Sequence, residues 1–150
     1  MSDAIETTEG PTVSQLAETW LSLRDRAEAL VSERPDDPGA VANIMHEVEV
    51  LMIEIADYLN KLNHQRYTAE RAHSKRRNAA LSVHGKSYGV TIARAMADVE
   101  ALPEQAAWDA LRAAYHYAED TQKALQTKHY GLMNVNKNMQ SVMFERGRRQ

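Results

Sequence analysis

The stretch that decides the fold is the C-terminal segment 104–145, EQAAWDALRAAYHYAEDTQKALQTKHYGLMNVNKNMQSVMFE. Its apolar side chains recur at alternating steps of three and four residues for five heptads. This spacing places them on one side of an α-helix, and its persistence is typical of helices that pack as coiled coils. The seam has two sets of positions, Leu111, Ala118, Leu125, Leu132 and Met139, and Trp108, Tyr115, Gln122, His129, Asn136 and Met143.

The polar residues of the second set leave two interpretations open. Gln122, His129 and Asn136 either lie in a helix interface, where they cost stability and fix register and subunit number, or they face water at its rim. On the first interpretation the segment joins copies of the chain. The expected oligomer interface then contains Leu111, Tyr115, Leu125, His129, Leu132 and Met139.

Three further helices are predicted before this segment. Apolar residues again step by three and four, and the sequence Pro-Asp-Asp-Pro-Gly at 35–39 separates the first helix from the second. Two glycines at 85 and 89 break the second helix from the third, and Pro103 fits the first turn of the last. The predicted helices span about 13–34, 40–83, 90–102 and 104–145.

The lengths of these helices argue against a compact monomer. The second helix would be about 65 Å long at 1.5 Å per residue, which is too long for one small globule. We expect a single helical domain at 12–145 between a disordered tail at 1–11 and a basic tail at 146–150. The predicted fold is all-α, with long helices and heptad-like seams, assembled into a helical oligomer.

Composition bounds the class of protein. The chain has 150 residues and no cysteine, so disulfides and thiolate metal sites are excluded and a reducing compartment is indicated. The first residues lack the basic and apolar regions of a secretory signal. No apolar run approaches the ~20 residues that cross a bilayer. We expect a soluble cytoplasmic protein with no membrane partner.

No motif in the sequence supports catalysis. The segment 80–87, ALSVHGKS, fits a relaxed phosphate-loop pattern, but a charged helix precedes it where a buried strand is required. Glu70 and His73 have the i, i+3 spacing of a di-iron helix, and the sequence has no second such pair. No serine lies in a glycine-flanked nucleophile turn. We therefore expect no enzyme activity, no cofactor and no metal site.

Charge divides the chain in two. Residues 1–57 hold thirteen acids and three bases, a balance of -10, whereas residues 58–150 hold eight acids and fifteen bases, a balance of +7. Such a division indicates a half that binds polyanions, or association between oppositely charged surfaces. The third interpretation is that the charged faces are simply solvated.

The positive charge concentrates in residues 61–86, KLNHQRYTAERAHSKRRNAALSVHGK, with seven bases and one acid. Tyrosines flank or interrupt the bases, and proteins that bind single strands combine a positive track with aromatic side chains. Alternatively, these bases pair with the acidic segment of a neighbouring subunit. The candidate nucleic-acid-binding residues are Arg66, Arg71, Lys75, Arg76, Arg77, Lys86 and Tyr88.

The order of these features resembles the phage recombination-mediator family typified by UvsY, over about residues 40–145. An apolar helix ends in SKRRNAALS (74–82), a glycine-containing linker HGKSYG (84–89) follows, and a short helix leads into the long last helix. The most similar part of that last helix is Ala124-Leu125-x-x-Lys128-x-Tyr130. The helix at 13–34 and the residue His129 depart from the family pattern.

The resemblance implies a non-enzymatic, ring-forming protein that binds single-stranded DNA. Such a protein helps a recombinase to displace single-strand-binding protein and load onto DNA, in the host cytoplasm if the chain is phage-encoded. By the same resemblance Lys75, Arg76 and Arg77 contact DNA, and the last helix carries oligomerisation. Two alternatives stay open, both without nucleic acid: a structural or adaptor helical oligomer of phage type, and a regulator that binds a protein partner through the acidic half.

Overall fold

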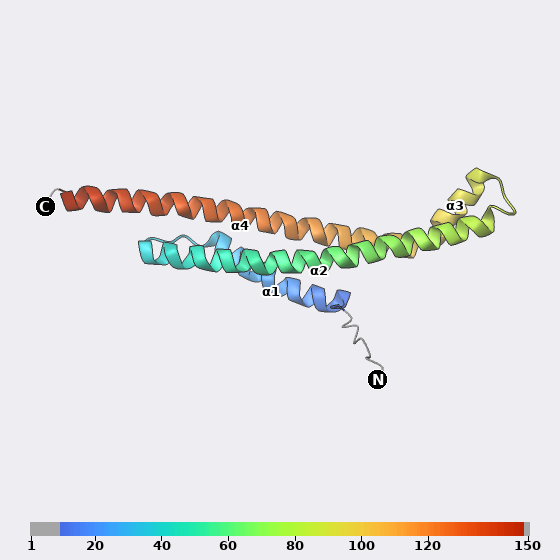
Figure 1. Cartoon of the computed structure of the whole chain (residues 1–150), viewed down its shortest axis with the longest axis horizontal. Helices are drawn as coiled ribbons and strands as arrows, with labels where there is room; N and C mark the ends of the chain where they lie inside the picture. The colour runs from blue at the N-terminus through green and yellow to red at the C-terminus, as the bar shows by residue number, and fades with distance from the viewer. Residues whose placement is uncertain (1–9, 149–150) are drawn as a thin grey trace, which may run out of the picture.

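The computed structural model describes residues 10–148, which form four α-helices and no strand (Figure 1). The prediction of an all-α fold is confirmed. The tail expected at 1–11 falls mostly on residues 1–9, which lie outside the described residues, and residues 146–148 continue the last helix. The helices are α1 (Val13–Ser32), α2 (Pro38–His84), α3 (Val90–Glu100) and α4 (Leu102–Arg148).

Polar residues define where the first two helices begin. The Thr12 side chain accepts a hydrogen bond from the Gln15 amide, and the Gln15 side chain accepts one from the Thr12 amide, which is a capping box. Asp37 accepts a hydrogen bond from the Ala40 amide, and Pro38 follows it in the first turn of α2. The Pro-Asp-Asp-Pro-Gly break is therefore both a stop for α1 and a start for α2.

The two long helices, α2 and α4, run antiparallel and side by side for most of their 47 residues each (Figure 1). Residue numbers rise along α2 as they fall along α4, since Glu49 contacts His129 whereas Arg66 contacts Tyr115. The apolar set of the α4 seam is buried in this packing. Its buried members are Leu111, Ala118, Leu125 and Leu132, and Met139 packs against the same core.

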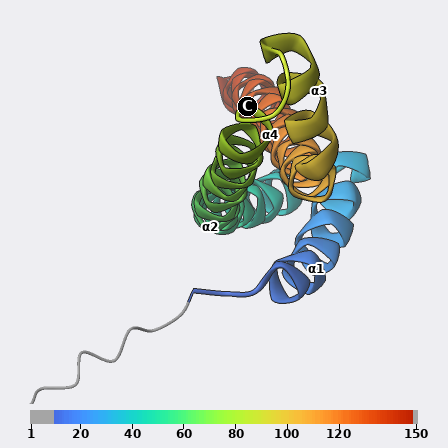
Figure 2. The same cartoon turned by 90° about the vertical axis from the view of Figure 1, so that its right-hand side faces the viewer.

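Helix α1 packs across α2 and α4 beside the first half of α2 and completes a three-helix core (Figure 2). The Trp20 ring stacks on Tyr58 of α2 at 5.3 Å between centroids and meets Tyr117 of α4 edge-on at 5.5 Å. Aromatic pairs in these geometries contribute about 0.5–1.5 kcal/mol beyond the area they bury. Arg26 of α1 also forms an ion pair with Glu54 of α2.

Lys128 of α4 closes the C-terminal end of α1. Its ammonium group donates hydrogen bonds to the carbonyl oxygens of Val31, in the last turn of α1, and of Glu33, the residue that follows the helix. Burial and the neighbouring Arg34 guanidinium lower the pKa of Lys128. Lys128 therefore stabilises the C-terminal end of α1 in this chain. It belongs to the stretch 124–130 that carries the family resemblance.

The three-helix core ends near the start of α1, where the Pro11 carbonyl accepts a hydrogen bond from Gln65 of α2 at 3.0 Å. After Leu62 the next buried residue of α2 is Ala80. Helix α1 therefore lies beside the first half of α2 and leaves the basic second half to α3 and α4 alone.

The packing predicts a large difference between two isoleucines that are two residues apart on α2. Ile55 is 0% exposed and Ile53 is 71% exposed. We expect Ile55→Ala to lower the free energy of unfolding by about 2–5 kcal/mol, because it leaves a cavity in the core. Ile53→Ala is the matched control and should change it by less than about 0.5 kcal/mol. Urea denaturation followed by circular dichroism measures both, and equal losses would contradict this core.

Candidate nucleic-acid interface

The basic stretch forms the end of the molecule at which α2 turns back into α3 (Figure 1). The Gly85 amide donates to the Leu81 carbonyl at 2.8 Å, and the Tyr88 amide donates to the His84 carbonyl at 3.0 Å. A Cβ at residue 85 would lie 2.9 Å from the Leu81 carbonyl oxygen, which is too close for a side chain. Glycine at this position therefore lets the chain reverse within a few residues.

Alanines bring α3 close to α2 after this turn. Ala80 of α2 and Ala93 and Ala97 of α3 are all buried, whereas Val90, Ile92 and Val99 of α3 are exposed. Because methyl side chains allow a close approach of two backbones, the carboxylates at the end of α3 come within reach of the α2 bases. Sequence reasoning missed these carboxylates, Asp98 and Glu100.

The inner face of the basic stretch is partly neutralised by α3. Asp98 lies 2.5 Å from the Arg77 guanidinium, and Glu100 lies 3.5 Å from that of Arg76 and 2.5 Å from the His84 ring nitrogen. Solvent-exposed ion pairs contribute at most about 1 kcal/mol each, so these pairs orient side chains more than they stabilise the fold.

Two more members of the basic stretch pack on aromatic rings of α4. The Arg66 guanidinium lies over the Tyr115 ring at 4.6 Å from its centroid, and also over the Tyr67 ring of α2 at 5.1 Å. The His73 ring stacks on Trp108 at 5.6 Å. Cation–π contacts of this kind contribute about 0.5–2 kcal/mol, which gives Arg66 a packing role.

The outer face of the same stretch carries free positive charge. Arg71 and Lys75 lie one helical turn apart and point away from the side that holds Arg66, Arg77 and His84, as the helical period of 3.6 residues requires. Lys86 follows in the turn. These three bases are exposed, and within residues 10–148 none of them forms an ion pair. We call Arg71, Lys75 and Lys86 the outer basic face.

An exposed aromatic ring lies in the same turn as Lys86, near His84. Tyr88 is half exposed in the turn, with its ring centroid 6.2 Å from that of His84. An exposed tyrosine offers a flat surface on which a nucleic-acid base stacks, with about 1–3 kcal/mol per base. The seven candidate residues thus separate into an exposed group, Arg71, Lys75, Lys86 and Tyr88, and a group in contact with α3 or α4, Arg66, Arg76 and Arg77.

The residues expected at an oligomer interface face the chain's own helices. Leu111, Leu125 and Leu132 are buried in the core, and Met139 packs against it. Tyr115 lies beneath Arg66, and the His129 ring nitrogen is 2.9 Å from a Glu49 carboxylate oxygen. In this arrangement the seam is filled by α1 and α2, and contact with a second copy requires a different surface.

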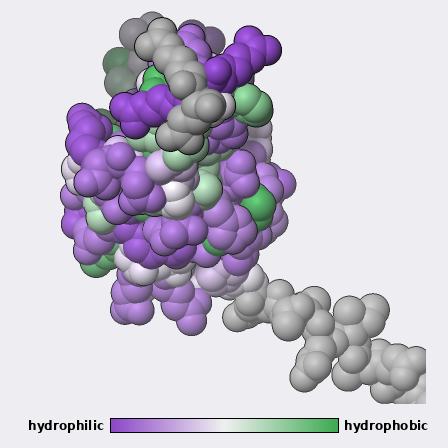
Figure 3. All heavy atoms as spheres, turned by 90° about the vertical axis from the view of Figure 1, so that its left-hand side faces the viewer, coloured by the Kyte–Doolittle hydropathy of each residue, from purple (hydrophilic) through white to green (hydrophobic). Residues whose placement is uncertain are grey.

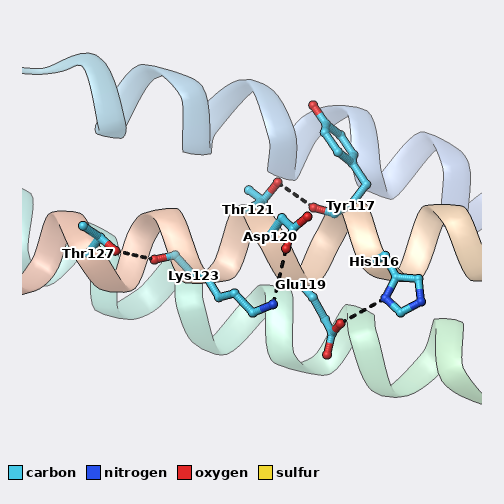
Figure 4. A network of polar contacts seen from close by, with 7 residues as sticks. All are labelled: His116, Tyr117, Glu119, Asp120, Thr121, Lys123 and Thr127. Atoms are coloured by element: carbon cyan, nitrogen blue, oxygen red, sulfur yellow. Dashed lines mark hydrogen bonds and ion pairs between the residues drawn. The ribbon is translucent and has the colours of Figure 1, made fainter.

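Polar residues elsewhere on α4 pair along the helix itself (Figure 4). His116 lies 3.3 Å from Glu119, and Lys123 lies 3.3 Å from Asp120, in both cases three residues away on the same helix. Across residues 10–148 no three histidine or carboxylate side chains gather as metal ligands would. Over the same residues, no helix is both long and apolar enough to cross a membrane.

Comparisons of the chain with protein-family models, with curated proteins and with solved structures found no match. The resemblance to the recombination mediators therefore stays a prediction from the residues quoted above.

Proposed function

We propose that the protein binds single-stranded DNA through the outer basic face and serves as a non-enzymatic recombination mediator. The observations that support this are the three exposed bases without carboxylate partners among residues 10–148, and an exposed tyrosine, Tyr88, in the turn that carries Lys86. Positive side chains attract phosphates whatever the base sequence, and the aromatic ring supplies sequence-tolerant stacking.

One copy of the chain offers few phosphate contacts. Three bases release few counterions, so binding by a single copy should be weak, with a slope of log affinity against log salt of only about 2 at ~0.7 per contact. Linking several copies raises the apparent affinity without any new contact to DNA. This need for several copies agrees with the oligomer that the resemblance implies. The protein partners that the resemblance implies are a recombinase and a single-strand-binding protein.

Substitution of the three residues of the outer basic face tests whether this face binds DNA. The variant Arg71→Ala/Lys75→Ala/Lys86→Ala should weaken binding to fluorescent oligo-dT by roughly 10- to 100-fold at low salt. It should also reduce the slope of log affinity against log salt by about 2, at ~0.7 per single-strand phosphate contact. Fluorescence anisotropy at several salt concentrations measures both quantities.

The control for this variant removes the same charge elsewhere. Lys61→Ala/Lys123→Ala/Lys137→Ala takes three exposed bases from outside the face. It should retain most of the affinity. Equal weakening by both triple variants would show that binding depends only on the net charge of the protein. Unchanged binding by Arg71→Ala/Lys75→Ala/Lys86→Ala would refute the assigned face.

Substitution of the two α3 carboxylates tests whether they keep Arg76 and Arg77 from binding DNA. The variant Asp98→Asn/Glu100→Gln removes the carboxylates that hold Arg76 and Arg77, with little change in shape. We expect tighter oligo-dT binding, by roughly 3- to 10-fold, because two more guanidinium groups become available to phosphates. The free energy of unfolding should change by no more than about 1 kcal/mol per pair.

A charge-matched control again separates local from general effects. Glu119→Gln/Asp120→Asn makes the same change in net charge in the middle of α4, away from the turn (Figure 4). The binding gain should be clearly smaller than for the α3 variant. If both variants gain equally, Asp98 and Glu100 do not restrain the bases as proposed.

A further inference from the structure

The chain enters α1 directly beside α2. The Pro11 carbonyl accepts the hydrogen bond from Gln65, and Pro11 shares a groove with Lys61 of α2. The capping box at Thr12 fixes the direction in which the chain reaches the helix. Figure 2 shows the described residues before α1 running toward the side of the molecule on which α2 lies. Residues 1–9 are thus tethered at the middle of α2.

An exposed polar stripe of α2 begins next to this tether. His64, Thr68, Arg71 and Lys75 follow one another at steps of four, three and four residues, so they share one side of the helix. All four are exposed, and no ion pair among residues 10–148 includes Arg71 or Lys75. Hydrophilic side chains cover most of the surface in the view of Figure 3, and binding to such a surface depends on complementary charge. The stripe therefore fits an acidic partner.

The segment tethered beside the stripe is acidic. Residues 1–9, MSDAIETTE, hold Asp3, Glu6 and Glu9 and no base. An extended chain spans at most about 3.3–3.6 Å per residue. The backbone of Glu6 therefore reaches at most about 17 Å from Pro11, and that of Asp3 at most about 28 Å.

These lengths match two of the three bases of the outer basic face. Arg71 and Lys75 lie about 9 and 15 Å past the level of Gln65 along α2, at 1.5 Å per residue. They point about a quarter to a third of a turn around the helix from Gln65. Lys86, about 31 Å past that level, is farther than an extended backbone brings Asp3. The acidic segment thus reaches part of the face and leaves the rest open.

Helix α1 carries acids too, but its packing prevents them from reaching the stripe. Leu16, Leu23 and Ala27 are buried in the core that α1 shares with α2 and α4. Moving the acids of α1 onto the basic face would open this core. Residues 1–9 precede the core, so their acids are the ones that can reach the stripe with the fold intact.

We propose that residues 1–9 bind the outer basic face of their own chain, with Glu6 at Arg71 and Asp3 at Lys75, and so compete with single-stranded DNA. The competition rests on the proposed function, whereas the contact itself does not. Tethering gives the segment a high effective concentration, about millimolar for short linkers. Its ion pairs are exposed and screened by salt, so the segment weakens DNA binding and does not abolish it.

Neutralising the three acids tests the competition. The N-terminal variant Asp3→Asn/Glu6→Gln/Glu9→Gln should bind oligo-dT roughly 3- to 10-fold more tightly than wild type at low salt, and the gain should shrink as salt rises. In the background of Arg71→Ala/Lys75→Ala the gain should vanish, because the bases for which the segment competes are gone. Fluorescence anisotropy measures each affinity.

A charge-matched control separates this competition from a general effect of net charge. Glu119→Gln/Asp120→Asn/Glu145→Gln removes three acids from α4 and should gain clearly less affinity. A gain equal to that of the N-terminal variant would overturn the competition. A gain that persists without Arg71 and Lys75 would overturn it as well.

Cross-linking tests the contact without DNA. A carbodiimide joins a carboxylate to a lysine ammonium group when the two are in contact, so the wild-type chain suffices. Mass spectrometry of a mixture of isotope-labelled and unlabelled protein should find Asp3 or Glu6 joined to Lys75 within one chain. An absence of links to Lys75, links to Lys61 alone, or links to Lys75 only between differently labelled chains would refute the proposal.

The two tests separate this contact from the proposed function. If the link to Lys75 forms but neither wild type nor the N-terminal variant binds oligo-dT, the proposed function is refuted and the contact stands. If both proteins bind oligo-dT with the same affinity and no link to Lys75 forms, the contact is refuted and the proposed function stands.

Discussion

The antiparallel packing of α2 on α4 is the contact on which the rest of the structure depends. Leu51, Ile55 and Leu62 of α2 are buried in one core with Leu125 and the other seam residues of α4. The two helices are equally long and pair within one chain, and the two ends of this pair differ in structure. One end is the turn into α3, and the other is the point at which α4 continues beyond α2 (Figure 1).

At the first end, alanines and carboxylates together determine which bases are available. The close approach at Ala97 lets Asp98 and Glu100 pair with the inner bases, and the outer basic face points the opposite way. The basic stretch is thereby divided into a side whose bases pair with α3 and an outer side whose bases remain free to attract anions. The proposed DNA contact is consequently smaller than the net charge of residues 61–86 indicates.

Much of the fold follows from the spacing of apolar residues, since steps of three and four specify a helix and the face it buries. The same spacing does not say whether the partner helix belongs to the same chain. Leu125 at a seam looks alike in either case, and here it packs on α1 and α2. The candidate bases were visible as a charge cluster, but their division depends on Asp98 and Glu100, which only the reversal after Gly85 brings near.

The most direct test of this account is whether the seam closes within one chain. Spin labels on Thr68→Cys/Ala113→Cys, measured by double electron–electron resonance, should report a short separation, because packed helix axes lie about 8–10 Å apart. Moving the second label to Asn134→Cys displaces it by about 30 Å along the helix axis, at 1.5 Å per residue, and should raise the distance to more than about 30 Å. Both distances should persist when labelled protein is mixed with excess unlabelled protein before refolding. A short distance that vanishes in this mixture would show that α2 pairs with the α4 of another copy, which contradicts the account.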